Sequence, residues 1–118
     1  MESINKLLEG LISVDGVAAA VVIGNDGFVI DSLTSTTIDT DVIGGIVSGG
    51  IKSTEEMGSE LNIGHLHQSM IEYDKGVILT KLINTQGAIL AIVTKEGAVI
   101  GNVRYQLNKF SEQISKLL

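Results

Sequence analysis

Residues 17–23 limit the possible folds more than any other segment, because all seven positions are apolar. The run is short for a buried helix, and it is followed by Gly24-Asn25-Asp26-Gly27, a combination typical of a hairpin turn. Residues 28–33 then return as a second strand. A strand that is apolar on both faces must be covered on both faces. The sequence therefore predicts a sheet held between two layers of helices.

Apolar periodicity places the remaining elements. A first helix follows the N-cap candidate Ser3 and places its apolar residues at helical spacing, while a last helix opens near Gly101. Between them we expect a helix over residues 41–61 and strands over residues 66–73, 77–83 and 88–94, joined by short turns that favour antiparallel pairing. The predicted order is α-β-β-α-β-β-β-α, a five-stranded antiparallel sheet in a single α+β domain spanning residues 1–118.

The composition excludes several classes of function. The net charge is −6 and the eight Lys and Arg are scattered, so neither nucleic acid nor an anionic membrane surface is an expected partner. There is no cysteine, which excludes disulfides, thiolate chemistry and Cys-based zinc sites. The first residues lack the pattern of a signal peptide, and no apolar run is long enough to span a membrane. We therefore expect a cytoplasmic protein.

The predicted helix over residues 41–61 contains five glycines, at positions 44, 45, 49, 50 and 58. Their combined cost relative to alanine is roughly 3–5 kcal/mol, so something must offset it. Gly50 and Gly58 fall on the arc of the apolar residues, which we expect to pack on the sheet: Val42, Ile43, Ile46, Val47, Ile51, Met57 and Leu61.

Gly45, Gly49 and Ser53 instead form a row of small residues on one flank of this helix. Rows of this kind allow two helix backbones to approach closely, so the row predicts contact with a second helix. The alternative is that Gly45 and Gly49 make room for a loop of the same domain. The polar face beside the row is either a solvated surface or the rim of a docking site, and it consists of Ser48, Lys52, Glu55, Glu56 and Ser59.

Motifs that would indicate catalysis or a cofactor are incomplete. Residues 45–53 nearly match a phosphate-binding loop, but Ile51 stands where the pattern requires lysine and no strand precedes it. His65 and His67 share a strand face, yet only Glu72 or Asp74 is available nearby as a third metal ligand. The histidines could also make association at a strand edge sensitive to pH. We predict no catalytic residues, no cofactor and no metal, and hence a binding or regulatory protein rather than an enzyme.

The chain resembles the Roadblock/dynein light chain superfamily, in particular its stand-alone prokaryotic members. The features that carry the resemblance span nearly the whole chain. They are residues 14–17 at the end of the first helix, the strand and turn of residues 19–27, residues 57–61 closing the glycine-rich helix, residues 89–93, and residues 101–104 opening the last helix. Their order and spacing, rather than any one of them, indicate the family.

The resemblance implies a five-stranded antiparallel sheet with the first and last helices on one face and the central helix on the other. It also implies a homodimer in which third strands pair edge to edge and central helices lie side by side. The implied interface contains Leu66, Gln68 and Met70 of the pairing strand, together with Gly45, Gly49 and Ser53. Removal of an unpaired strand edge is a physical reason for such pairing.

Members of this superfamily regulate or scaffold small Ras-like GTPases, or serve as motor and signalling light chains. We therefore predict a regulator or scaffold of a small Ras-like GTPase, with activation of hydrolysis as one form of regulation and an adaptor in polarity, motility or signalling as the alternative. Arg104 is the only arginine, and it opens the last helix on the face away from the docking helix. Activation would then proceed without an arginine finger. The structural alternative for Arg104 is an ion pair with Asp15 or Asp31.

Overall fold

The computed structural model describes residues 3–118 as three helices and five strands in the predicted order. The N-terminal half contains α1 (Ile4–Ile12), β1 (Val17–Ile23), β2 (Val29–Thr34) and α2 (Thr40–Glu60). The C-terminal half contains β3 (Gln68–Tyr73), β4 (Gly76–Leu82), β5 (Ile89–Thr94) and α3 (Ile100–Ser115). Ser3 caps α1 by accepting from the Lys6 N–H, and Asp39 caps α2 by accepting from the N–H groups of Asp41 and Val42.

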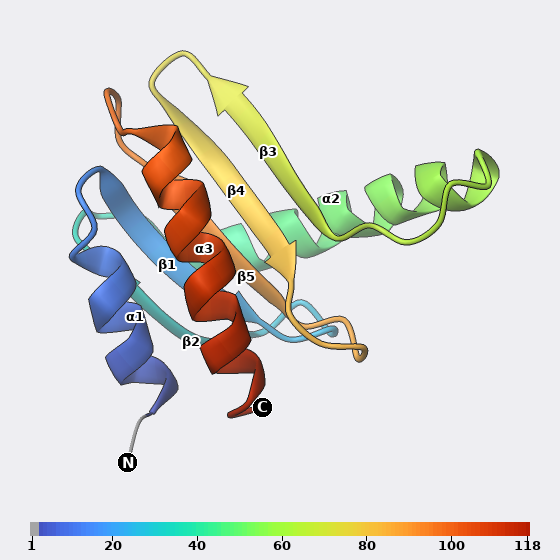
Figure 1. Cartoon of the computed structure of the whole chain (residues 1–118), viewed down its shortest axis with the longest axis horizontal. Coiled ribbons are helices and arrows are strands. Elements are labelled where there is room, and N and C mark those ends of the chain that lie inside the picture. Colours follow the sequence, from blue (N-terminus) through green and yellow to red (C-terminus); the bar gives the residue numbers. More distant parts are fainter. Residues whose placement is uncertain (1–2) are drawn as a thin grey trace.

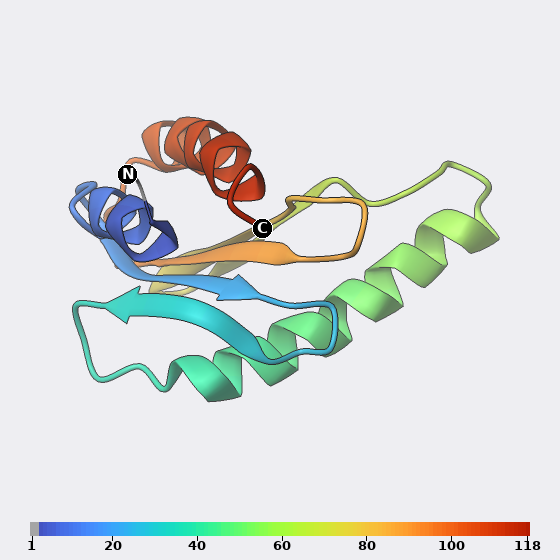
Figure 2. The same cartoon turned by 90° about the horizontal axis from the view of Figure 1, so that it is seen from below.

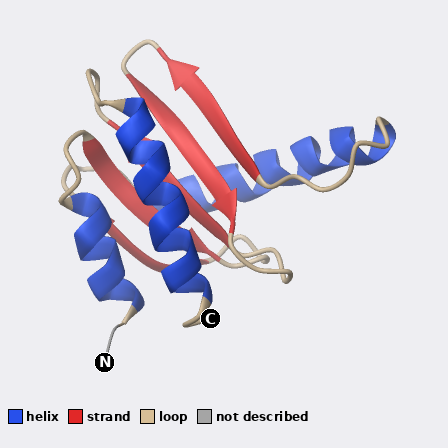
Figure 3. Ribbon diagram, viewed as in Figure 1, coloured by secondary structure: helices blue, strands red, loops and turns tan. Residues whose placement is uncertain are grey.

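All strand pairs are antiparallel, and the strand order across the sheet is β2-β1-β5-β4-β3 (Figure 3). β1 and β5 are central, while β2 and β3 are the two edges of this sheet. α1 and α3 cover one face, and α2 crosses the other (Figures 1 and 2). The predicted α+β class, element order and three-layer arrangement are confirmed.

β1 is buried along its entire length because it contributes side chains to both layers. Ala20 and Val22 belong to the larger core beneath α1 and α3, whereas Val21 and Ile23 belong to a smaller core beneath α2. The smaller core is completed by partly buried side chains of α2 and neighbouring strands, including Ile43, Val47 and Ile51. Full coverage of an apolar strand, as predicted for residues 17–23, is therefore confirmed.

α2 is longer than the part of the sheet that it covers. Its 21 residues span about 30 Å, and its packing is against β1 and β2. Beyond that contact the helix continues past the β3 edge of the sheet (Figures 1 and 2). The expectation that all apolar residues of this arc pack on the sheet is wrong for four of them, which are more than half exposed: Val42, Ile46, Met57 and Leu61.

The glycines of α2 fall into two groups. An added Cβ at Gly44 would lie 2.9 Å from a methyl group of Val29, and one at Gly58 would lie 2.5 Å from the carbonyl oxygen of Gly64. At Gly45, Gly49 and Gly50, no atom lies within 4 Å of such a Cβ. Gly50 therefore does not pack on the sheet, and Gly58 packs on the following loop. The alternative in which Gly45 and Gly49 accommodate a loop of the same domain is also wrong.

We predict opposite effects of alanine at two of these positions. Gly49→Ala reduces the conformational entropy of the unfolded chain, and its methyl group would point into open space in the folded chain. It should therefore raise the free energy of unfolding by about 0.5–1 kcal/mol. Gly58→Ala places a methyl group against a backbone carbonyl and should lower the free energy of unfolding by about 1–3 kcal/mol. Urea denaturation monitored by circular dichroism measures both. Equal changes in the two variants would contradict the assigned environments.

Candidate interaction surface

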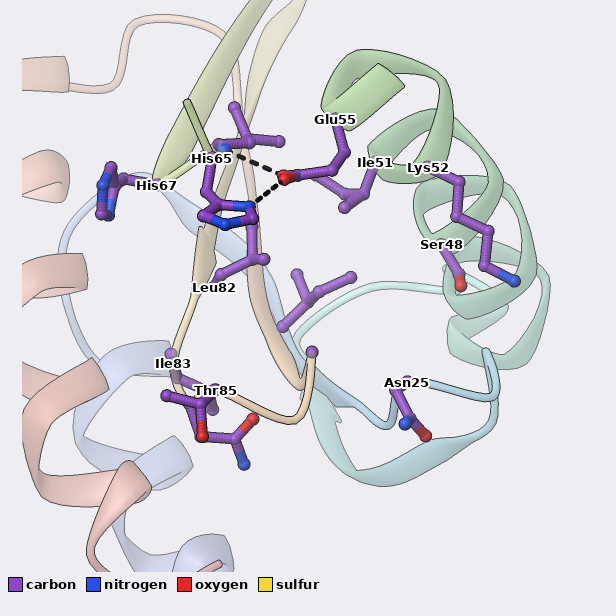
Figure 4. A pocket seen from close by; sticks show the side chains of 14 residues that line it. Asn25, Ser48, Ile51, Lys52, Glu55, His65, His67, Leu82, Ile83 and Thr85 are labelled. Carbon is purple, nitrogen blue, oxygen red and sulfur yellow. Dashed lines mark hydrogen bonds and ion pairs between the residues drawn. The ribbon is translucent and has the colours of Figure 1, made fainter. Parts of the chain in front are cut away.

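One flank of α2 borders a hollow of about 680 Å³ between the helix and three loops. Ser48, Ile51, Lys52 and Glu55 line it from the helix (Figure 4). The β1–β2 turn contributes Asn25. The remaining lining comes from the α2–β3 loop and from the β4–β5 turn with the strand ends beside it: His65, Leu66, His67, Leu82, Ile83, Asn84, Thr85, Gly87 and Ile89. The hollow lies where α2 leaves the sheet.

Glu55 fastens the α2–β3 loop to the helix. Its Oε1 lies 2.7 Å from His65 Nδ1, and its Oε2 accepts a hydrogen bond of 2.8 Å from the Leu66 N–H (Figure 4). The hydrogen bond with His65, followed by that from Leu66, lowers the pKa of the Glu55 carboxyl below its ordinary value of 4.5. The loop also contains the left-handed residues Asn62 and Gly64. Sequence reasoning found Glu55 and His65 separately but not their contact.

A second hollow lies next to the first, between the same flank of α2 and the β1–β2 turn. Gly45 and Gly49 border it from the helix, and residues 26–29 border it from the turn. Ser48 and Lys52 line both hollows. Since Gly45 and Gly49 have no side chains, the helix backbone is accessible here. Phe28, at the rim, is 76% exposed.

The predicted docking residues are only partly on one surface. Lys52, Glu56 and Ser59 are exposed, and Glu55 is partly buried by its contacts with the loop. Ser48 is the exception, because it is only 7% exposed. Its Oγ would lie 3.4 Å from a Cβ built on Gly27, so the β1–β2 turn covers it. The placement of Ser48 on the outer face is therefore wrong.

The predicted pairing strand begins later than expected, at Gln68, so Leu66 lies in the preceding loop. Gln68 points toward α3. In the amide orientation that matches donors with acceptors, it accepts from Arg104 Nε at 3.1 Å and Nη2 at 3.0 Å and donates to Asn108 Oδ1 at 3.2 Å. Met70 lies on the same strand face beside Arg104 and is 56% exposed.

Arg104 therefore supports the edge strand through Gln68 instead of forming an ion pair. Within residues 3–118 one basic side chain lies within ion-pair distance of a carboxylate, that of His65 beside Glu55. The predicted pairing of Arg104 with Asp15 or Asp31 is absent, and Asp31 instead accepts a hydrogen bond from Asn5 at 3.4 Å. Among the same described residues, no three His, Asp or Glu side chains gather closely enough to hold a metal ion.

Apolar surface is exposed on both sides of the β3 edge. Val77 and Leu79 of β4 face α1 and α3, so the alternate residues Ile78 and Thr80 face the α2 side. Ile71, which pairs with Ile78, is 50% exposed on that face, and Tyr73 is 56% exposed. Three further apolar side chains are exposed near the end of α2, that of Met57 on the helix and those of Leu61 and Ile63 just after it. The sequence patterns did not reveal this surface.

We predict that Glu55→Gln changes the pH dependence of stability. The folded-state pKa of Glu55 is lowered, so its stabilisation is complete above about pH 4.5 and is lost as the pH falls through the folded-state pKa. The variant should therefore be less stable than the wild type near neutral pH, with a difference that shrinks in acid. Glu56→Gln is the matched control, because Glu56 is exposed and its pH curve should follow the wild type. Urea denaturation between pH 3 and pH 7 measures the difference, and parallel curves for Glu55→Gln and wild type would contradict the assignment.

Curated relatives of similar length come from the archaeon Methanocaldococcus jannaschii. One uncharacterized protein is 28% identical over 114 residues, covering 97% of this chain and 95% of the relative. A second is 27% identical over 114 residues, covering 97% of this chain and 98% of the relative. None of the helices in residues 3–118 is both long and apolar enough to cross a membrane.

Solved structures share the fold. MglB from Myxococcus xanthus has a TM-score of 0.88 at 16% identity and covers 97% of this chain and 93% of its own. The gliding protein MglB from Thermus thermophilus has a TM-score of 0.86 at 19% identity, covering 96% of this chain and 86% of its own. The model of the Roadblock/LC7 domain matches residues 3–94, which include every strand and the first two helices. The chain belongs to the Roadblock/LC7 domain family.

Proposed function

We propose that this protein acts as a homodimer that binds and regulates a small Ras-like GTPase. The observation that carries the proposal is the unpaired β3 edge, next to which α2 extends with exposed apolar side chains beyond its own sheet. Family membership and the structural similarity to MglB support the same interpretation. Nothing in the site suggests chemistry of its own, so the proposed role is regulation or scaffolding.

The dimer would join the two β3 edges into one continuous sheet. Antiparallel pairing of two β3 strands satisfies backbone groups that otherwise face water. It also brings the protruding end of each α2 over the exposed sheet face of the other protomer. There Met57 and Leu61 would cover residues such as Ile71 and Tyr73, which are about half exposed in the single chain. Removal of this apolar surface from water would drive association.

The helix contact within the dimer has two candidate flanks. The sequence favours the row of Gly45, Gly49 and Ser53, which borders the β1–β2 turn in the structure. The other flank consists of Ile46, Gly50, Met57 and Leu61; we call it the apolar flank. Its side chains are exposed, and its glycine meets no atom of its own chain. We place the helix contact on the apolar flank, because association there covers apolar area as well as bare backbone.

The GTPase would then dock on the flank that contains Gly45, Gly49 and Lys52, with Glu56 and Ser59 further along the helix. Bare glycine backbone allows close approach, and Lys52 and Glu56 supply a polar rim that fixes the orientation of a partner. Arg104 lies on α3, across the sheet from this flank, where it contacts Gln68. Any stimulation of hydrolysis would therefore act by repositioning loops of the GTPase rather than through an arginine finger.

The two flanks can be separated by leucine substitutions at matched glycines. Gly45 and Gly50 are both exposed and free of close contacts, but they lie about 140° apart around the helix. Light scattering should give the wild type twice the chain mass of 12.4 kDa at micromolar concentration. Gly50→Leu should weaken the dimer by about tenfold or more through steric clash, whereas Gly45→Leu should leave it intact.

The reverse effects of the two leucine substitutions would move the helix contact to the other flank. Loss of the dimer only in Gly45→Leu would assign the helix contact to the row of Gly45, Gly49 and Ser53. A monomeric wild type under these conditions would refute the homodimer itself.

Partner binding is tested with the immobilised full chain and extract of its native cells. We expect a small Ras-like GTPase, identified by mass spectrometry, to be retained more strongly with a non-hydrolysable GTP analogue than with GDP. Lys52→Glu should reduce its retention several-fold, and Lys109→Glu, a charge reversal on α3, should not. Retention that does not depend on the nucleotide would instead support the alternative role as an adaptor in polarity, motility or signalling.

A further inference from the structure

The hollow between α2 and the three loops has the size and chemistry of a small-molecule site. Its volume of about 680 Å³ lies within the range of roughly 300–1,000 Å³ that is usual for ligand pockets. Four separate segments of the chain meet around it, and apolar side chains of Ile51, Leu66, Leu82 and Ile89 form much of its lining (Figure 4). An apolar lining with a few polar groups is the usual composition of such pockets.

Ser48 supplies a polar group to the hollow. The residue is only 7% exposed and lines the hollow, and its hydroxyl takes part in none of the hydrogen bonds formed within residues 3–118. No buried side-chain nitrogen or oxygen of the described residues lacks a partner, so the Ser48 hydroxyl is open to water in the hollow, and a ligand there would replace that water. Ser48 thus offers an unused donor and acceptor to an occupant of the hollow.

The free hydrogen-bond donors around the hollow favour an anion. Glu55 is the only carboxylate in its lining, and both of its oxygens already accept, from His65 and from the Leu66 N–H. Lys52 also lines the hollow, and its ammonium has no hydrogen-bond partner within residues 3–118, whereas the ring of His67 points away from the hollow (Figure 4). Asn25, Asn84 and Thr85 add neutral polar groups. This excess of free donors stands out in a chain of net charge −6.

We propose that this hollow binds a small amphiphile, a molecule with one anionic head and an apolar body. The head would lie between Lys52 and the hydroxyl of Ser48, since a charge-assisted hydrogen bond is the strongest contact available there. The apolar body would lie against Ile51, Leu82 and Ile89. This site is separate from the β3 edge, and the proposal holds whether or not a GTPase is the partner.

The test uses the full-length ¹⁵N-labelled chain and octanoate as the probe, titrated below the concentration at which it forms micelles. We expect saturable shifts of backbone amide signals confined to residues around the hollow, such as Ile51, Leu66 and Thr85. Octyl phosphate should bind similarly, which would show that the site does not distinguish a carboxylate from a phosphate head group. Acetate and 1-octanol should bind much more weakly. Acetate lacks the apolar body and 1-octanol lacks the charge.

Variants separate this site from general surface binding. Lys52→Met should raise the dissociation constant of octanoate by about fivefold or more, as expected for loss of one charge-assisted contact. Ser48→Leu should abolish the shifts by filling the hollow, and Ser48→Ala, which cannot overfill it, should weaken binding less. Lys95→Met, on the turn after β5, is the control and should bind as the wild type.

The proposal is overturned by shifts that do not saturate, by equal binding of octanoate and 1-octanol, or by a Lys52→Met variant that binds as the wild type. Retained signal dispersion in each variant shows that the fold persists. Because the readout uses neither oligomeric state nor GTPase binding, failure here leaves the proposed regulatory function standing.

Discussion

The buried strand β1 is the constraint on which the rest of the structure depends. Its seven residues offer no polar side chain to water, so the chain must supply a neighbouring strand on each side and a helical layer on each face. β2 and β5 provide the neighbours, α1 and α3 form one layer, and α2 forms the other. The layers are unequal: two helices cover one face, but a single helix crosses the other. The incomplete second layer leaves the β3 end of the sheet open.

This imbalance explains why the surfaces of interest gather around α2. A single straight helix cannot cover a twisted sheet of five strands, so only the part near β1 and β2 is buried. Beyond that part, the apolar residues Met57 and Leu61 remain exposed, and the following loop must return to the sheet. Glu55 holds that loop by its contacts with His65 and Leu66. Because this loop runs back to the sheet at a distance from α2, it leaves a hollow between the helix, the α2–β3 loop and the β1–β2 and β4–β5 turns.

The sequence predicts the features that depend on local pattern. It misses how far one element covers another and which distant segments come into contact. Helix periodicity and hairpin turns were sufficient for the element order, because each is encoded within a few residues. Periodicity assigns the whole apolar arc of α2 to the sheet but cannot show where the sheet ends, so Leu61 is exposed beyond it. Ile46 is exposed for another reason, because it lies on the flank of α2 that faces away from the core formed with Ile43 and Val47. Ser48 was misplaced because its cover is the β1–β2 turn, which lies some twenty residues earlier in the chain. The contact between Gln68 and Arg104 joins segments that no motif connects.

The glycines of α2 connect stability with association. Gly44 and Gly58 are explained by backbone or side-chain atoms that leave no room for a Cβ. Gly45, Gly49 and Gly50 have no such reason within the chain, and together they lower helix stability by roughly 2–3 kcal/mol relative to alanine. If other chains cover these positions, binding stabilises the helix by mass action, and the exposed part of α2 is then most ordered when its partners are present. If both proposed associations occur, the stability of α2 depends on each of them, which couples them thermodynamically without any change of fold.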